Sequence, residues 1–189
     1  MTGRLLTLKN TKLVLSIDPS GNWFDGKGRS GLVLAEVDEK GFKVLHKETI
    51  NAKDFDTYQE YWVAHINAVD PELDALIVED FMLYPGVSQH YSYMETPRLI
   101  GVLQMQAYAL DIPITLQRAT EVSMLKESVL IERGILEKRK GRYWHDKRIY
   151  NDHERSALKH LLKWYRKEYD NEPIQKENQS EAVRVPTYT

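Results

Sequence analysis

Near its start the chain carries a short apolar run of residues that ends on a single carboxylate. It comprises Leu13 to Ile17, then Asp18 and a Pro-Ser-Gly turn at residues 19–21. A buried strand has this pattern, with its polar end exposed where the chain reverses. The Asp18 carboxylate either opens the turn by bonding to the downstream backbone or holds a cation or proton at the strand end. These residues alone leave both interpretations open.

Length and composition narrow the class of protein. The 189 residues suit one domain with its own core, which we expect over 1–169, with a polar and flexible tail over 170–189. The absence of cysteine excludes disulfides, thiolate nucleophiles and Cys-ligated zinc. No apolar run approaches the roughly 20 residues of a membrane span, and no signal-peptide pattern opens the sequence. We therefore expect a cytoplasmic protein with no membrane partner.

The first half of the chain predicts an α/β architecture. Three strands joined by short polar turns form an antiparallel meander, over 13–18, 31–37 and 42–50. Residues 53–69 then change to the spacing of an amphipathic helix. A strand reached through a helix is most simply parallel to an earlier neighbour.

That next strand, over 73–81, repeats the pattern of the first because its apolar run ends on Glu79. If it lies beside the first strand, Asp18 and Glu79 stand at the same edge of the sheet. Neighbouring strands are about 4.8 Å apart, so the two carboxylates could share one divalent ion. Asp80 should point to the opposite face, and we expect it to be structural.

The middle of the chain completes the sheet. Residues 82–95 form a loop whose tyrosines (Tyr84, Tyr91 and Tyr93) either stack on bases or pack within the loop. Thr96 and Pro97 predict a helix start that continues to Leu110. A fifth strand over 112–116 and a helix over about 119–134 follow.

Residues 138–148 carry the strongest charge asymmetry in a chain of net charge −2. Six of these eleven residues are cationic, with Tyr143 and Trp144 between them. Such a basic loop suits phosphate contacts with base or sugar stacking. The alternative is a solvated surface loop with a buried Trp144, and we favour phosphate binding.

The last predicted helix opens at Asn151-Asp152-His153-Glu154-Arg155-Ser156. Asp152 and Ser156 lie one turn apart on one side, with His153 beside them. Capping is the alternative for Asp152, since an acid in the first turn complements the helix dipole.

The order of these motifs resembles the RuvC-type Holliday junction resolvases, closest to the bacteriophage versions, within the ribonuclease H-like superfamily. The resemblance covers about residues 13–165 in element order and rests on three short stretches: strand-Asp-Pro-Ser-Gly, Val-Glu-Asp-Phe, and Asp-His-Glu-Arg-Ser-Ala-Leu-Lys-His. It implies a mixed five-stranded sheet flanked by helices, with the fourth and fifth strands parallel to the first.

The resemblance also implies a set of metal ligands. The first-strand Asp of the family matches Asp18, and the fourth-strand Glu matches Glu79. The two ligands of the last helix fall on His153 and Ser156, where Ser156 departs from the usual carboxylate. We expect Asp152 to replace it, so the expected catalytic and metal-binding residues are Asp18, Glu79, Asp152 and His153, with Glu154 as an alternative to Asp152.

The implied activity is that of a Mg²⁺-dependent endonuclease on branched DNA, with Mn²⁺ as a substitute. Two ions about 4 Å apart would be bridged by Asp18. The resemblance further implies a homodimer, and the cytoplasm of a bacterial host if a phage encodes the protein. The expected DNA contacts are Lys126, Lys138, Arg139, Lys140, Arg142, Tyr143, Lys147 and Arg148.

Other functions stay open on the same residues. A related nuclease acting on other DNA or RNA would share all these ligands, and Ser156 leaves room for a nucleic-acid-binding protein with an inactive site. A sugar-kinase or actin-like ATPase shares the first strand and its acidic turn. It would need a second Gly-rich phosphate loop and a second domain, and the sequence has neither.

Overall fold

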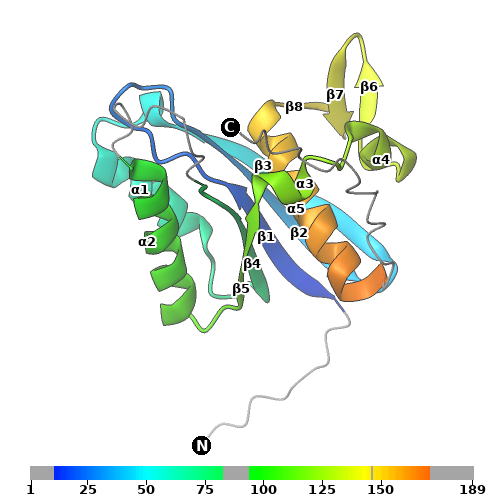
Figure 1. Ribbon diagram of the computed structural model, residues 1–189, viewed down its shortest axis with the longest axis horizontal. Helices are drawn as coiled ribbons and strands as arrows, with labels where there is room; N and C mark the ends of the chain where they lie inside the picture. The colour runs from blue at the N-terminus through cyan, green and yellow to red at the C-terminus, as the bar shows by residue number, and fades with distance from the viewer. Residues whose placement is uncertain (1–10, 83–93, 146, 171–189) are drawn as a thin grey trace, which may run out of the picture.

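The computed structural model describes residues 11–82, 94–145 and 147–170. Its centre is a five-stranded sheet with the strand order β3-β2-β1-β4-β5 (Figure 1). The central strand β1, Lys12–Asp18, is the apolar run that ends on Asp18. The expected mixed sheet is confirmed, because β1, β2 and β3 are antiparallel while β4 and β5 run parallel to β1.

The meander forms through two long strands, β2 (Arg29–Asp38) and β3 (Gly41–Asn51). The tight turn between them is held by Asp38, whose carboxylate accepts hydrogen bonds from the amides of Lys40 and Gly41. Gly41 has a φ of 151°, a backbone conformation that side chains rarely adopt.

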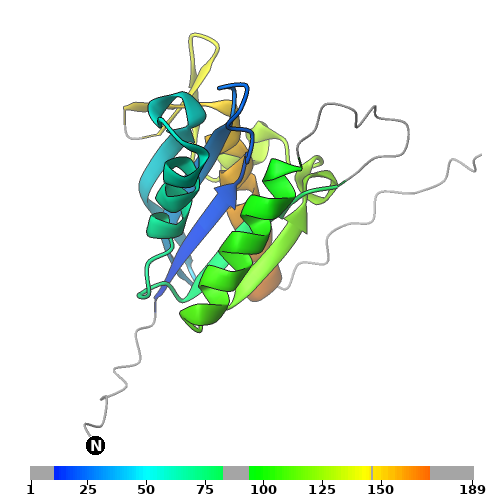
Figure 2. The same cartoon turned by 90° about the vertical axis from the view of Figure 1, so that its left-hand side faces the viewer.

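The helical crossovers lie on one face of the sheet. A 3₁₀ turn, Ala52–Asp54, precedes α1 (Tyr58–Ala68), which opens with a capping box between Thr57 and Glu60. Strand β4 (Ala75–Asp80) follows, then α2 (Glu95–Ala109) and β5 (Ile114–Arg118). Figure 2 shows α2 in front of the strands and α5 (Asp152–Tyr165) behind them.

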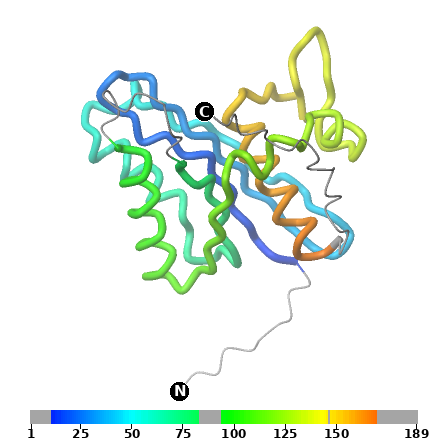
Figure 3. The backbone as a smooth tube through the Cα atoms, viewed as in Figure 1, coloured from blue at the N-terminus to red at the C-terminus, as the bar shows by residue number. Residues whose placement is uncertain are grey.

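Alternation along β1 divides the core between these two faces. Leu15 and Ile17 pack with the helices α1 and α2, whereas Val14 packs with α5. Ser16 also faces α5, and its hydroxyl donates to the carbonyl of Ala157 at 2.8 Å. Figure 3 traces how α5, late in the chain, returns to the central strands.

Three predicted elements differ from the structure. The single helix expected over 119–134 is two short helices, α3 (Ala119–Val122) and α4 (Glu127–Glu132), because Lys126 is extended, with φ −67° and ψ 151°. Helix α2 begins at Glu95 after the left-handed Met94, so Thr96 is not its N-cap. The Thr96 hydroxyl instead accepts from the amide of Gly21.

The third difference is the basic stretch, which is a small antiparallel sheet rather than a loop. Its strands are β6 (Glu137–Arg139), β7 (Arg142–His145) and β8 (Arg148–Tyr150). Lys140 and Gly141 both have positive φ, as a two-residue hairpin turn of this hand requires. A π-helical turn, Arg166–Asp170, follows α5.

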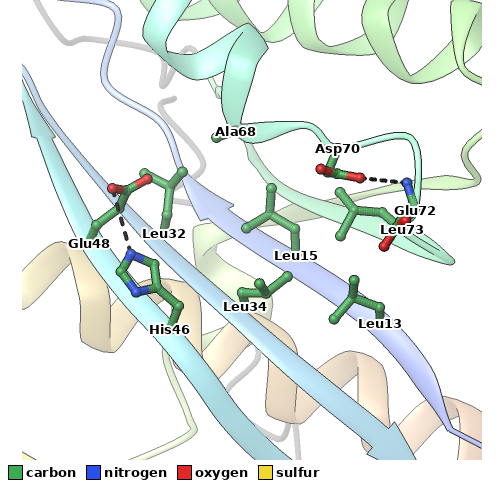
Figure 4. Close-up of a pocket in the computed structure, with 10 residues that line it drawn as sticks. All are labelled: Leu13, Leu15, Leu32, Leu34, His46, Glu48, Ala68, Asp70, Glu72 and Leu73. Carbon is green, nitrogen blue, oxygen red and sulfur yellow. Dashed lines mark hydrogen bonds and ion pairs between the residues drawn. The ribbon is translucent and has the colours of Figure 1, made fainter.

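An apolar cavity of about 180 Å³ opens on the α1 face, away from the strand ends that carry Asp18 and Glu79. Figure 4 shows leucines of β1 and β2 lining it, between His46 and Glu48 of β3 and the Asp70–Glu72 turn.

Among the residues described, no helix is both long and apolar enough to cross a bilayer.

Candidate active site

Two carboxylates stand side by side at the carboxyl ends of β1 and β4. The parallel register pairs Ile17 with Val78, so the next residues along, Asp18 and Glu79, are neighbours. Their side chains are 14% and 21% exposed. Two like charges in this partly buried position repel one another, and a divalent cation would relieve that repulsion.

One face of α5 meets both carboxylates, because residues three and four apart project from the same side of a helix. His153 Nδ1 lies 3.0 Å from Asp18 Oδ2. One turn later, the Ser156 hydroxyl donates to Glu79 Oε2 at 2.8 Å. His160 reaches the same oxygen through Nε2, also at 2.8 Å.

His160 is fully buried, and its ring is fixed from both sides. Because an ionised carboxylate only accepts, Nε2 of His160 carries the proton shared with Glu79. The other ring nitrogen lies 3.0 Å from the side-chain amide of Gln117 on β5. Glu79 is therefore oriented by a buried contact that continues to the neighbouring strand.

These contacts shift the protonation of the site in different directions. Burial raises the pKa of Asp18, the hydrogen bond from His153 lowers it, and the charge of Glu79 raises it, with a net increase. Burial raises the pKa of Glu79 too, but the hydrogen bonds and charge of His160, with Ser156, outweigh it and leave that pKa lowered. The hydrogen bond with Asp18 raises the pKa of His153.

The structure brings three of the four expected ligands together, namely Asp18, Glu79 and His153, but not Asp152. The Asp152 side chain is 88% exposed, and its carboxylate pairs with the guanidinium of Arg155 at 2.5 Å. Asp152 and His153 are consecutive in a helix and so point about 100° apart, which turns only His153 toward the strand ends. Asn151 is the N-cap of α5, and Asp152 lies in its first turn, where its negative charge complements the helix dipole.

Glu154, the alternative ligand, has a structural partner instead. It is buried, completes a capping box with Asn151, and accepts from Lys47 of β3 at 2.7 Å. The charge pair joins α5 to the edge strand, and a buried acid with such a partner is not available to a metal.

The fit of the site to Mg²⁺ or Mn²⁺ depends on its two carboxylates. These ions prefer oxygen ligands, and Mg²⁺ is commonly bound by only one or two protein carboxylates together with substrate oxygens. Asp18 and Glu79 supply this donor set, with His153 at their side. Within the described ranges, no group of three or more acidic or histidine side chains is already arranged as a metal site. The donor chemistry thus fits a cation held jointly with substrate.

A cavity of about 290 Å³ lies in front of Glu79 and is lined also by Ser20, Thr96 and His153. Asp80, which we expected to be structural, lines it as well. The candidate site therefore opens into a space beside the turn that follows β1.

That turn is held from behind by a buried hydrogen-bonded group. His65 Nδ1 donates to the carbonyl of Tyr61 at 2.7 Å, which leaves Nε2 to accept from the Ser30 hydroxyl, also at 2.7 Å. Ser30 in turn accepts from the amide of Ser20 at 2.8 Å. The Tyr61 hydroxyl donates to the Ser20 carbonyl at 2.5 Å. Both backbone groups of Ser20, two residues after Asp18, are fixed in this way.

The expected DNA-binding residues lie mostly on the small sheet. Its cationic side chains are exposed, and they are Lys138, Arg139, Lys140, Arg142, Lys147 and Arg148. Arg139 pairs with Glu137. Tyr143 is partly buried, with Lys138 and Arg155 over its ring, so this ring is already engaged. Lys126 is exposed between α3 and α4, and the tyrosines Tyr84, Tyr91 and Tyr93 fall outside the described residues.

Sequence reasoning missed His160 and the group behind the turn. The available signal for His160 was its position four residues after Ser156, on the helix face that carries His153. For Ser30 and His65 the sequence offers no comparable signal, because only the sheet and α1 bring them together.

Comparisons with known proteins agree with this architecture. No protein-family model and no curated protein sequence matches the chain. Among solved structures, a Thermus thermophilus RuvC in complex with Holliday junction substrate is similar, at 22% identity and a TM-score of 0.56 over 80% of this chain and 90% of that one. A second Thermus thermophilus RuvC structure has 20% identity and a TM-score of 0.57 over 82% and 95%. This likeness establishes a shared ribonuclease H-like fold.

Proposed function

We propose that this protein is a Mg²⁺-dependent endonuclease that cuts branched DNA, with four-way junctions as its substrate. The observation that carries the proposal is the convergence of Asp18, Glu79 and His153 at adjoining strand ends. The fold supports it, because one of the similar structures is a RuvC bound to Holliday junction substrate. Exposed cations on the β6–β8 sheet supply a surface for the DNA backbone.

In this proposal Asp18 and Glu79 hold the metal, with His153 as the third group. When bound, the ion stabilises negative charge that develops on the phosphodiester and helps to activate water. Ser156 and His160 orient Glu79 by donating to one of its oxygens. His153 orients Asp18 in the same way. The helix α5 thus fixes both carboxylates before substrate arrives, which reduces the cost of arranging them during the reaction.

The test is a cleavage panel with Mg²⁺, containing in parallel a four-way junction, a flap, a linear duplex and an RNA–DNA hybrid. Symmetric nicks confined to the junction are the expected result. Asp18→Asn and Glu79→Gln should abolish cleavage while junction binding persists, and Glu36→Gln, an exposed acid at the far end of β2, is the matched control. Cutting of the hybrid or the linear duplex instead would assign a different nucleic-acid substrate.

A second candidate, a nucleic-acid-binding protein with an inactive site, is favoured by Ser156. This hydroxyl occupies the helix position from which a third carboxylate would reach the site, and it donates to Glu79 instead. Calorimetric titration with Mn²⁺ separates the two functions. An active site binds Mn²⁺ and loses that binding in Asp18→Asn, whereas junction binding without any Mn²⁺ binding or cleavage identifies the inactive form.

The proposal includes a homodimer, because two symmetric nicks require two active sites. Analytical ultracentrifugation of the protein with and without junction DNA measures this. A monomer that nicks only one strand of the bound junction would contradict it.

A further inference from the structure

A second cavity, of about 390 Å³, is lined by His153 but not by Glu79. Its walls come from four parts of the chain: Arg29 at the start of β2, the turn and strand of the β6–β7 hairpin, the end of β8, and the start of α5. His153 lines this cavity and also the one in front of Glu79. The two spaces therefore meet at one histidine, which belongs to the proposed metal site.

The cavity beyond His153 is cationic. Arg29, Arg142 and Arg155 line it, against one carboxylate, that of Asp152. That carboxylate is paired with Arg155, which also lies 3.6 Å from Glu127. In the part of the chain that the structure describes, neither Arg29 nor Arg142 is paired with an acid, and both are exposed. The guanidinium groups of Arg29 and Arg142 are therefore accessible to a ligand from solution.

The walls of this cavity are held in place by contacts of their own. The Arg155 guanidinium lies over the ring of Tyr143 at 4.7 Å and donates to the carbonyl of Tyr150 at 3.1 Å. Strand β8 is tied to β3 by Lys47, which donates to the carbonyl of Ile149 at 2.7 Å. Arg142 begins β7 directly after the Lys140-Gly141 turn, so its backbone position is fixed by that hairpin.

Arg29 is fixed relative to the metal site as well. Strand β2 passes so close to α5 that Gly31 lies directly against the backbone of His153 and Glu154. Arg29 and His153 line the same cavity. Arg29, two residues before Gly31, is therefore held at a fixed position relative to the acidic cluster formed by Asp18 and Glu79.

We infer that this cavity binds a backbone phosphodiester next to the one that is cleaved, on the same strand, through Arg29 and Arg142. The inference rests on the proposed function and adds the path of the substrate strand: from the acidic cluster, past His153, to the hairpin. Guanidinium groups suit this ligand because each can donate two parallel hydrogen bonds to phosphate oxygens and stays positively charged at all physiological pH values. An acidic cavity for metal and an adjoining cationic cavity for phosphate together fix where along the strand the cut falls.

The test replaces single phosphates of a four-way junction by neutral methylphosphonates, one position at a time on either side of the cut. Binding is measured by fluorescence anisotropy in the Asp18→Asn background, so that no cleavage intervenes. One replacement next to the cut, on one side only, should weaken binding about tenfold, as expected for loss of a charged hydrogen bond. When Arg29→Gln and Arg142→Gln are combined with Asp18→Asn in one protein, the same phosphate replacement should change the junction affinity less than about twofold.

The salt dependence of binding gives a second readout. Each lost phosphate contact should reduce the slope of log affinity against log salt by about 0.9. Lys43→Gln, an exposed cation at the opposite end of the sheet, is the matched control and should keep the methylphosphonate effect unchanged. Thermal denaturation checks that the two arginine variants stay folded, and each single variant should show part of the loss.

The outcomes separate this inference from the proposed function. If junctions are cut but no phosphate beside the cut matters, or the effect is as large in the arginine variants as in their parent, the cavity does not bind backbone phosphate. The nuclease proposal would then still stand. A protein that neither binds nor cuts any nucleic acid overturns both.

Discussion

His153 Nδ1 lies 3.0 Å from Asp18 Oδ2, although 135 positions separate the two residues in the chain. The contact exists because β1 ends where α5 begins to cross it. Ser16 on β1 is bonded to Ala157 on α5, and Gly31 on β2 lies against His153 itself. Substitutions that change how α5 meets the strand ends should therefore change metal binding.

The buried His160 should be needed to position Glu79 rather than to contact substrate. His160→Leu removes the donor to Glu79 Oε2 and leaves Gln117 without its partner. Loss of such a supporting contact typically weakens metal binding 10- to 100-fold, and an unsatisfied buried group costs about 1–3 kcal/mol. We expect a weaker Mn²⁺ affinity by calorimetry with unchanged junction affinity, and partial rescue in His160→Gln. Equal Mn²⁺ affinity in wild type and His160→Leu would contradict this role.

Ser156 should limit how tightly the site holds a cation. Ser156→Asp places a third carboxylate beside Glu79, which raises the repulsion in the metal-free protein. The expected result is a lower melting temperature without metal and a larger increase on adding Mn²⁺, since a ligand stabilises the state that binds it more tightly. Differential scanning calorimetry with and without Mn²⁺ measures both.

Ser156→Ala is the control for loss of the hydroxyl alone, and it should show no gain in the Mn²⁺ effect. A Ser156→Asp variant whose melting temperature responds to Mn²⁺ as the wild type does would show that this position does not reach the metal.

Gly31 should be indispensable because α5 lies on its backbone. A Cβ there would come within 2.2 Å of the His153 carbonyl carbon and 2.4 Å of the Glu154 amide nitrogen. Backbone atoms cannot move aside as a flexible side chain can, so Gly31→Ala should displace the start of α5 and destabilise the protein by about 1–3 kcal/mol.

Gly101→Ala is a matched control, because nothing lies within 4 Å of a Cβ at that position of α2. In a helix this change should be neutral or stabilising by up to about 1 kcal/mol. Urea denaturation compares the two variants, and equal stabilities would refute the close approach of β2 and α5.

The buried His65 should make stability depend on pH below neutrality. Burial lowers its pKa from 6.5 to about 4, against the opposing hydrogen bond with the Tyr61 carbonyl. Between these values the unfolded chain binds more protons than the folded one, so the free energy of unfolding falls as the pH decreases from 6.5 to 4. The loss attributable to His65 is up to about 3 kcal/mol.

His65→Gln keeps a donor and an acceptor without a titrating group, so its stability should fall less over this pH range. Urea denaturation at four pH values between 4.5 and 7.5 measures the difference, with the exposed His46→Gln as the control. Parallel pH profiles for wild type and His65→Gln would exclude His65 as the cause.

Much of the fold followed from local patterns. The alternating and apolar runs predicted all five strands of the central sheet, and the helix between the third and fourth strands predicted the parallel pairing that places Glu79 beside Asp18. The prediction of a single helix over 119–134 was wrong because the helical spacing of apolar residues, among them Val122 and Leu130, continues across Lys126, whose backbone is extended. In the basic stretch, Lys140-Gly141 is the sequence that indicates a hairpin turn. We predicted a loop there because we considered only the charge of the stretch.

Local sequence patterns specify which residues end the strands and which chemical groups the last helix presents. Period and composition are local properties, and they are enough to put a carboxylate at the end of β1 and another at the end of β4. Which helix residues reach those carboxylates depends instead on how α5 packs against the strands. A difference of one residue rotates a side chain by about 100° around the helix, so the close contact of β2 with α5 turns His153, Ser156 and His160 toward the site and Asp152 away from it.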